Sequence, residues 1–442
     1  MNAIPNFKPH NLNNISVLGS RLGTLGFYLF LFALLSLQVL LIILTLFDNQ
    51  VIPPPLSLRL DPFKNLVQNN KYENARTELN MINAQALHYS FATANPHFAT
   101  KDYLTAIAEE QRYKEAYKKT QEMVVYQGPI EHIFFHPLLA YPELAFNNDK
   151  QTKGFNDWFV TVKEFKKILD SLYKNNYILI DIHAIFNKSD NGKPLVRKVL
   201  LLPSGKKPLI ISIDDLNYYK YMILKGTVHK LILDENGNIA SFSLSPQGIP
   251  TTSRDNEIIP ILDQFIQEHE DFSLNGAKGI VALTGYEGVL GYRTNELDSP
   301  NFPFEKNQAL ILINRLKETG WSFASHGYGH LDTRKNPLTV LARDTQRWLK
   351  EVAPITGLTD VYIYPFGSSV LPGDPKFQYL LDNGFRVFCS VGPNPFLKSG
   401  PDYLMMDRRH IDGMALHYQA TLLKGFFESS EIIDEVRPVF IP

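Results

Sequence analysis

Cysteine is almost absent from this chain of 442 residues, in which Cys389 is the single one. A disulfide needs two cysteines and a thiolate zinc cluster needs several, so both are excluded within the chain. An excess of either charge is also lacking, because 44 Lys and Arg stand against 45 Asp and Glu, a formal net charge of -1. This balance points to no nucleic-acid partner and to no acidic solvating tail. The hydrophobic share of 44% is ordinary for a chain that buries a large core.

Charge is also missing from one long segment, residues 25–47, which reads LGFYLFLFALLSLQVLLIILTLF. About 20 apolar residues are enough to cross the hydrocarbon core of a bilayer as a helix. A cleaved signal peptide is the alternative, but it would have a shorter apolar region followed by a small-residue cleavage site, whereas Asp48 and Asn49 follow here. We therefore expect an uncleaved transmembrane anchor at residues 25–47.

The charges around this segment predict its orientation. Lys8 and Arg21 precede it and Asp48 follows it. Positive residues favour the cytoplasmic side, so residues 1–24 are expected in the cytoplasm and the rest of this single-pass protein outside the cell membrane. Residues 48–127 start with a proline run and continue with two helical patterns, which predict a linker and a small helical stalk.

From residue 128 onward, apolar runs typical of strands alternate with amphipathic helices. Strands are expected at 130–135, 177–182, 199–202, 209–213, 279–283, 321–325, 361–364 and 387–391, and helices at 161–175, 258–268, 307–319, 337–352 and 376–383. The turn Asp234-Glu235-Asn236-Gly237 predicts a hairpin in an insertion around residues 225–255. Strand–helix alternation predicts an α/β fold with a parallel sheet, either open or closed into a barrel, over residues 128–442.

Two motifs follow expected strands, at the end where α/β folds place their sites. Asp214 and Asp215 come directly after an apolar strand. Neighbouring carboxylates repel, which favours a cation or a shared proton, although such a pair can equally cap a loop. His326 and His330 lie four residues apart in a glycine-rich turn. A helical turn would place both rings on one face for a metal, and two surface histidines are the alternative.

A third motif, Pro365-Phe366-Gly367, ends the expected strand at 361–364. Such a turn can direct backbone N–H groups at a developing oxyanion, or it can simply terminate the strand. Taken together, one Asp and two His are ligands suited to a divalent metal ion, most simply zinc, with an open coordination position. Asp214 is then placed to take a proton from the attacking water.

The order of these three motifs resembles that of the polysaccharide deacetylases, also called NodB-homology domains or carbohydrate esterase family 4, over roughly residues 128–420. The resemblance implies a distorted (β/α)7 barrel. It also implies that Asp214 is the base, and that the Phe366 N–H helps to hold the oxyanion. The metal ligands that it implies are Asp215, His326 and His330.

Several positions bear on the remaining roles. The segment Ile133-Phe134-Phe135-His136 is similar to the strand opening of poly-N-acetylglucosamine deacetylases, which would place His136 near the site. The arginine expected in the third motif is missing, so Arg408 or Arg409 is expected to orient the base instead. His417 is the best match for the general acid, with His410 and His136 as competitors.

The resemblance implies hydrolysis of N-acetyl groups from N-acetylglucosamine-type sugars in cell-wall or surface polysaccharide, including peptidoglycan. Two other functions remain open: a glycan-binding surface protein that keeps the fold without turnover, and a hydrolase of other amides on the same metal site. A purely structural membrane protein gives no reason for the order of the three motifs.

Overall fold

The computed structural model describes residues 123–187 and 195–438. The expected cytoplasmic N-terminus and transmembrane anchor lie outside these residues, as does the expected stalk apart from its last residues, 123–127. Within the described ranges, no helix combines the length and the apolar character needed to cross a membrane. The described unit begins at Met123, five residues before the expected boundary.

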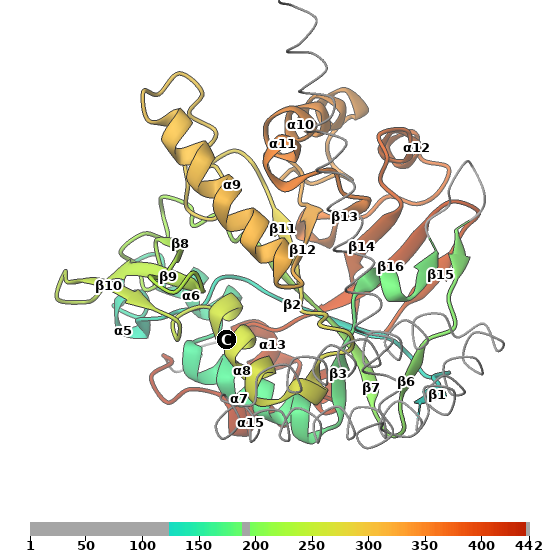
Figure 1. Ribbon diagram of the computed structural model, residues 1–442, viewed down its shortest axis with the longest axis horizontal. Coiled ribbons are helices and arrows are strands. Elements are labelled where there is room, and N and C mark those ends of the chain that lie inside the picture. Colours follow the sequence, from blue (N-terminus) through green and yellow to red (C-terminus); the bar gives the residue numbers. More distant parts are fainter. Residues whose placement is uncertain (1–122, 188–194, 439–442) are drawn as a thin grey trace, which may run out of the picture. The chain divides into compact units, whose positions relative to one another are not determined.

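A closed ring of parallel strands forms the centre of this unit (Figure 1). It runs β2–β7–β11–β12–β13–β14–β16 and returns to β2, with every neighbouring pair parallel. The ring strands are β2 (Glu131–Phe135), β7 (Lys207–Asp214), β11 (Ile280–Leu283), β12 (Ser322–Ser325), β13 (Val361–Ile363), β14 (Val387–Val391) and β16 (Leu404–His410). The predicted barrel of seven parallel strands is therefore confirmed.

The barrel is distorted by β3 (Tyr177–Leu179), which pairs with β7 at residues 207–209. β11 pairs with β7 at residues 212–214. Because β2 occupies the other edge of β7 over residues 209–213, β3 and β11 share one edge. The ring is thus closed at the carboxyl end of its strands and opened by β3 at the amino end.

Side chains that alternate along the strands point into the barrel or out of it, and they form two separate hydrophobic cores. Ile210, Ala282, Ile363 and Met406 belong to the cluster that fills the barrel. Leu209, Ile211 and Ile213 of β7, with the opposite parity, pack outward into the cluster shared with the surrounding helices.

Helices cover the outside of the barrel, with α9 to α12 at the top of Figure 1 and α7, α8, α13 and α15 at the lower left. Their bounds are α5 (Pro142–Ala145), α6 (Thr152–Trp158), α7 (Val162–Lys174), α8 (Ile258–Glu268), α9 (Phe302–Glu318), α10 (Leu338–Glu351), α11 (Ala353–Thr356), α12 (Pro375–Asp382), α13 (Gly413–Tyr418), α14 (Ala420–Leu423) and α15 (Ser429–Ile432). Short 3-10 turns are η2 (Ile182–Ala184), η3 (Glu270–Phe272) and η4 (Pro365–Gly367). The start of α7 is fixed by a capping box between Thr161 and Glu164.

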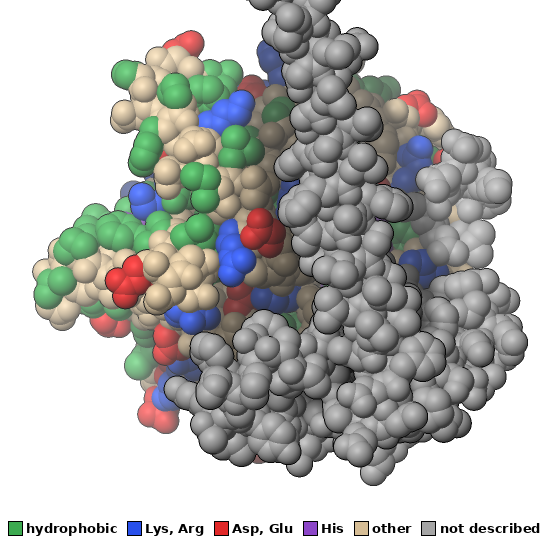
Figure 2. All heavy atoms as spheres, in the orientation of Figure 1, with side chains coloured by type: hydrophobic (Ala, Val, Ile, Leu, Met, Phe, Trp, Pro, Cys, Tyr) green, Lys and Arg blue, Asp and Glu red, His purple; other side chains and the backbone are tan. Residues whose placement is uncertain are grey.

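Smaller sheets lie beside the barrel. The expected hairpin is present as β8 (Lys230–Leu233) and β9 (Ile239–Leu244), and β10 (Pro250–Ser253) extends it into an antiparallel sheet of three strands. β1 (Met123–Val125) pairs with β6 (Leu201–Pro203), β4 (Phe186–Asn187) with β5 (Val196–Arg197), and β15 (Leu397–Ser399) with β16. On the face that Figure 2 shows, acidic and basic side chains are interspersed, as the near-zero net charge implies.

The segments around residues 201 and 209 form strand–loop–strand, since β6 pairs with β1. Two expectations need correction. The strand expected at 177–182 ends at Leu179, because the carboxylate of Asp181 accepts the backbone N–H of His183 and starts η2. The helix expected from 307 starts at Phe302, with Pro303 in its first turn, where proline loses no helical hydrogen bond.

Candidate metal centre

Asp214 and Asp215 end strand β7 in different conformations. Asp214 is the last residue of the strand and continues the inward parity of Ile210 and Ser212. Asp215 has a φ of 58°, in the left-handed region, so the chain turns there. Both carboxylates are buried, with 2% and 7% of Asp214 and Asp215 exposed. The turn therefore gives two adjacent acids separate directions at the mouth of the barrel.

His326 and His330 come from the loop after β12. Nδ1 of His326 lies 2.8 Å from the carbonyl oxygen of Ile363 on β13. A carbonyl can only accept, so Nδ1 carries the proton and Nε2 is left as the ligand atom, 3.8 Å from Oδ2 of Asp214. Burial lowers the pKa of His326, which favours the neutral imidazole that a metal needs. Nε2 of His330 lies 3.6 Å from Oδ2 of Asp215.

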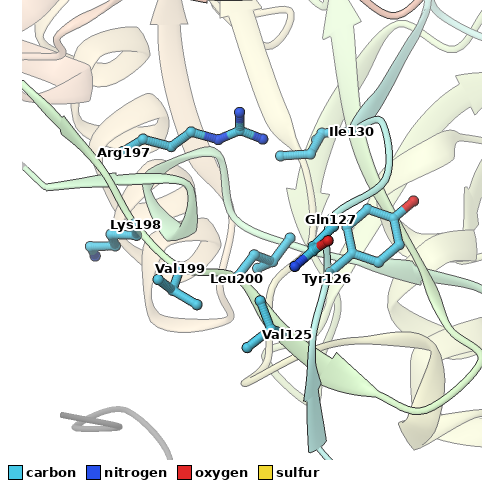
Figure 3. Close-up of a pocket in the computed structure, with 8 residues that line it drawn as sticks. All are labelled: Val125, Tyr126, Gln127, Ile130, Arg197, Lys198, Val199 and Leu200. Atoms are coloured by element: carbon cyan, nitrogen blue, oxygen red, sulfur yellow. The ribbon is translucent and has the colours of Figure 1, made fainter.

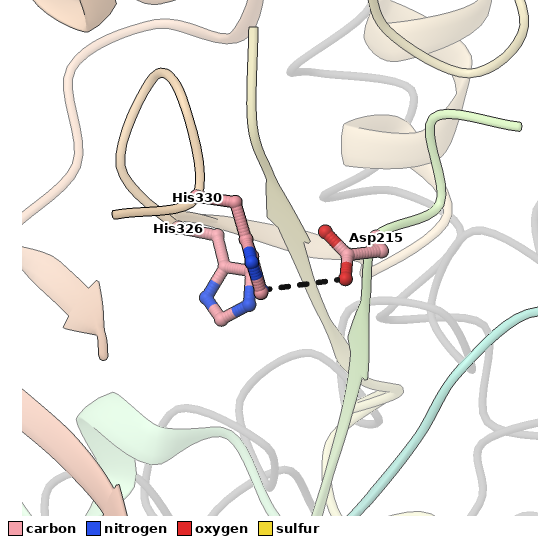
Figure 4. Close-up of side chains that lie close together, drawn as sticks. All are labelled: Asp215, His326 and His330. Atoms are coloured by element: carbon pink, nitrogen blue, oxygen red, sulfur yellow. Dashed lines mark ion pairs between the residues drawn. The ribbon is translucent and has the colours of Figure 1, made fainter. Parts of the chain in front are cut away.

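The structure brings Asp215, His326 and His330 together, with one possible ligand atom from each residue, all within 4.8 Å of one another. Figure 4 shows their side chains converging from the end of β7 and from the loop after β12. A carboxylate with two imidazoles matches a common donor set for zinc and related divalent ions. The residues therefore fit the expected metal.

Tyr219 fixes the orientation of Asp215. Its hydroxyl lies 2.5 Å from Oδ1 of Asp215 and 2.6 Å from the hydroxyl of Thr284. Because Oδ1 accepts the hydrogen bond from the Tyr219 hydroxyl, Oδ2 is the oxygen that is turned toward His330. The sequence pattern did not identify Tyr219, and its position four residues after Asp215 was the one available signal.

Asp344 on α10 shapes the loop that carries the two histidines. Its carboxylate accepts the backbone N–H groups of Tyr328 and Gly329, each at 2.7 Å. Gly327 has a φ of 66°, and a Cβ there would lie 3.0 Å from Asp344 Oδ2. A side chain at Gly327 would therefore disturb the anchor that holds the histidine loop.

Arg408 clamps Asp214 from inside the barrel. Its two terminal nitrogens donate to the two carboxylate oxygens at 2.7 and 2.9 Å, and one also donates to the Ser212 hydroxyl at 3.0 Å. Burial acts to raise the pKa of Asp214, but the charges of Arg408 and His326 outweigh it, so this pKa lies well below its usual range. Of the two candidate arginines, Arg408 holds Asp214, whereas Arg409 pairs with Glu131.

Phe366 follows β13 in a left-handed conformation, with a φ of 57°. Its ring is 70% exposed, and its centroid lies 4.4 Å from that of the His330 imidazole. Left-handed backbone at a residue other than glycine is strained, and four of nine such described residues are Asp215, Tyr218, His330 and Phe366. Such concentration is typical of functional sites.

The three candidate acids lie in different surroundings. His136 follows β2, beside β7, close enough to Asp214 for its charge to lower the pKa of that carboxyl. Its Nδ1 lies 3.1 Å from the Trp158 carbonyl oxygen, which leaves Nε2 as the nitrogen available to substrate. The ring nitrogens of His410 contact Asp412 and Gln419, both at 2.9 Å.

His417, the expected best match, lies in a different polar cluster. The charges that act on its imidazole are those of Arg437 and Glu164. Glu164 stands in the first turn of α7 and pairs with Arg437. The sequence preference for His417 over His136 is therefore not supported by position, because spacing along the chain could not show which histidine approaches Asp214.

A cavity of about 300 Å³ lies at the amino end of the barrel, far from this chemistry. Figure 3 shows it between the segment from Val125 to Ile130 and the segment from Arg197 to Leu200. Ile130 stands just before β2, so the cavity and the histidines lie at opposite ends of the parallel strands. The candidate site is therefore located by its three possible metal ligands, Asp215, His326 and His330, and not by this cavity.

Among known proteins, the chain is similar to solved structures whose sequence identity to it is low. No family model and no curated protein matches the chain. The solved structures that are similar to it include BA0330 from Bacillus anthracis, provisionally described as a polysaccharide deacetylase, the deacetylase PplD from Streptococcus pyogenes, and BC0361, a polysaccharide deacetylase from Bacillus cereus. Their identities are 16%, 13% and 16%, and their TM-scores 0.37, 0.37 and 0.36, each over 65% of this chain. The matches span 66% of BA0330 and of BC0361, just under two thirds of their lengths, and 94% of PplD.

Proposed function

We propose that the chain is a metal-dependent N-deacetylase of cell-wall or surface polysaccharide that contains N-acetylglucosamine-type sugars. The observation that carries the proposal is the convergence of Asp215, His326 and His330 beside Asp214, which Arg408 holds at both oxygens. Such a group suits the hydrolysis of an amide by an activated water.

Asp215, His326 and His330 would hold the metal, and zinc fits this donor set best. When bound, a divalent ion polarises the carbonyl of an acetamide and lowers the pKa of a water molecule. Tyr219 and the Ile363 carbonyl keep Asp215 and His326 in the orientation that this binding requires.

Asp214 is the base in this proposal. It is ionised near neutral pH and therefore ready to accept a proton from the attacking water. The bidentate contact with Arg408 fixes its plane, so the carboxylate does not have to be oriented during the reaction. The missing motif arginine and the unclear acid motivated the alternative without turnover. The contact of Arg408 with both Asp214 oxygens supports the active enzyme on the first of these two points.

His136 is the acid that would protonate the leaving amine. It follows β2, the neighbour of β7, and its charge acts on Asp214, while its Nδ1 contacts the Trp158 carbonyl oxygen. The backbone N–H of Phe366, at the turn after β13, would donate to the oxyanion. Base, acid and oxyanion donor thus come from three different strand ends.

The test is acetate release from N-acetylglucosamine oligomers and from peptidoglycan, with Zn²⁺ or Co²⁺ added. Wild type should release acetate and Asp214→Asn should not, while both bind the metal. A metal-loaded wild type that releases none from any of these substrates would contradict the proposal. Binding of glycan without acetate would favour the surface-protein alternative, and release from small amides alone would favour the other hydrolase.

The membrane placement is part of the same proposal. The apolar segment at 25–47 would anchor the chain, with the barrel outside the cell, where such a polymer lies. Protease added to intact cells should remove the barrel and leave a membrane-bound fragment. A barrel that is protected until the cells are opened would reverse the proposed orientation.

A further inference from the structure

Three tyrosines form a stack beside the candidate metal ligand Asp215. Tyr219 and Tyr221 belong to the loop after β7, and Tyr286 to the loop after its barrel neighbour β11. The Tyr219 ring lies 4.8 Å from the Tyr286 ring, with planes 19° apart, and 6.0 Å from the Tyr221 ring, with planes 20° apart. Tyr219 is stacked with both other rings, so Tyr221 and Tyr286 are the two outer rings of an aromatic stack that two loops build.

The stack reaches from the metal ligand to solvent. Tyr219 is 3% exposed and holds Asp215, whereas Tyr221 and Tyr286 are 49% and 37% exposed. Burial raises the pKa of Tyr286 to about 12, and the charge of Asp215 adds to this rise, which agrees with a position close to that carboxylate. Tyr219 therefore has a structural task, while the two outer rings present aromatic surface to the mouth of the barrel.

The two loops are held rigidly against each other. Arg293 donates to the carbonyl oxygens of Glu287 and Tyr218 at 2.6 and 2.8 Å, and so joins one loop to the other. The Glu287 carboxylate accepts a hydrogen bond of 2.6 Å from the backbone N–H of Lys220, the residue between Tyr219 and Tyr221 in the sequence. The backbone N–H of Tyr286 donates to the Tyr328 carbonyl oxygen of the histidine loop. The rings are thus ordered before any ligand arrives, which reduces the entropy lost on binding.

The chemistry of the two outer rings matches a sugar ring. A tyrosine combines a flat apolar ring with a hydroxyl group, and a pyranose combines an apolar C–H face with hydroxyls at its edge. Binding sites commonly join aromatic side chains to a few polar groups in this way. Single exposed aromatic residues are ordinary on protein surfaces. Two exposed tyrosines on neighbouring loops that hydrogen bonds hold together, beside a candidate metal ligand, are instead typical of a binding surface.

We propose that Tyr221 and Tyr286, the two outer rings of the stack, bind pyranose units of the glycan that neighbour the unit whose acetamide is hydrolysed. This inference rests on the proposed function and extends it, because it requires a polymeric substrate. Tyr219 does not touch sugar in this arrangement and acts on the metal through Asp215.

The experiment measures binding of N-acetylglucosamine and of its pentamer to the full-length chain, kept metal-free so that no turnover occurs, by calorimetry. The double variant Tyr221→Ala/Tyr286→Ala should weaken binding of the pentamer about tenfold or more, since two ring contacts are lost. Binding of the monosaccharide should change little. The matching double Phe variant keeps the rings and should stay within about threefold of wild type.

Phe304→Ala is the control, because Phe304 is an exposed aromatic, 59% accessible, on the outer helix α9. Zn²⁺ affinity of the double Ala variant should equal that of wild type, which shows that the metal site is intact. Unchanged pentamer binding by the double Ala variant would overturn the tyrosine inference and leave the deacetylase proposal standing. Equal weakening of monosaccharide and pentamer would also overturn it. A wild type that neither binds these glycans nor releases acetate from them would overturn both proposals.

Discussion

Arg408 and Asp214 form a buried ion pair whose two members come from strands that do not neighbour each other in the barrel. The Arg408 guanidinium also lies 4.1 Å from the centroid of the Phe134 ring. Its planar fork contacts both carboxylate oxygens, which the single ammonium of lysine cannot do. We expect Arg408→Lys to lower kcat/KM for acetate release about 100-fold. Arg409→Lys, which alters the neighbouring pair with Glu131, is the control and should stay close to wild type.

The acid can be identified by comparing His136 with His410. Nδ1 of His136 contacts the Trp158 carbonyl oxygen, whereas both ring nitrogens of His410 contact side chains. A general acid commonly accounts for a factor of about 100 to 10,000 in rate. His136→Gln should therefore lower kcat by about 100-fold or more with metal affinity unchanged, and His410→Gln should keep most of the activity. The opposite pattern, measured by acetate release, would assign the acid to His410.

Tyr219 gives a prediction that needs no turnover. Its hydroxyl holds Oδ1 of Asp215, and loss of a hydrogen bond to a metal ligand commonly costs about 10- to 100-fold in metal affinity. We expect Tyr219→Phe to show a loss of this size in Zn²⁺ titrations. Tyr218→Phe is the matched control, because the Tyr218 hydroxyl donates to Glu257 instead. Equal affinity of the two variants would remove the positioning role of Tyr219.

At the scale of elements, the sequence predicted strands that alternate apolar with polar residues and strands that are apolar throughout. It missed a strand in which a charged side chain points into the barrel. β16 was missed because Asp407, Arg408, Arg409 and His410 give it the composition of a loop. Its parity is nevertheless that of a strand, since Arg408 points into the barrel and Arg409 out of it toward Glu131. A buried charge hides the alternation that reveals a strand, because its partner, Asp214, is almost 200 residues away in the chain.

His183 joins two elements at the amino end of the barrel and gives a pH-dependent prediction. Its Nδ1 and Nε2 lie 2.9 and 2.8 Å from the carboxylates of Asp181, after β3, and Asp360, before β13. Burial acts to lower the pKa of His183, but these two carboxylates outweigh it and raise the pKa to about 9. The Lys198 ammonium donates to the backbone carbonyl of His183 and adds a positive charge nearby.

Because the folded pKa of His183 lies above its ordinary value of 6.5, its stabilisation is complete below pH 6.5 and is lost as the pH rises through about 9. One third of the side chain is exposed, so we expect only about 1 kcal/mol, or about 2 °C in Tm. Thermal unfolding should separate wild type from His183→Gln at pH 6 and bring them together at pH 10. A gap that stays constant over this range would mean that the imidazolium is not the stabilising form.

For the whole molecule, the pattern of strands and helices was enough to predict a barrel, because most of the ring strands are apolar and alternate with helices, although β16 is charged. The sequence could not predict at which end of the barrel the folded unit begins. Candidate chemistry gathers at the carboxyl end of the strands, and Met123, where the described unit starts, lies at the amino end through the pairing of β1 with β6.

The boundary of the folded unit follows from the same pairing. The sequence placed it at residue 128, but Met123, Val124 and Val125 pair with β6, and Tyr126 donates its backbone N–H to the Leu200 carbonyl oxygen. A chain of residues 123–442 should therefore fold alone, bind Zn²⁺ with the affinity of the full-length chain, and unfold cooperatively. A chain of residues 128–442 lacks β1, and the loss of its hydrogen bonds, each worth about 1 kcal/mol, should lower Tm by several degrees. Identical melting curves for the two chains would show that β1 contributes nothing and that the unit begins where the sequence first placed it.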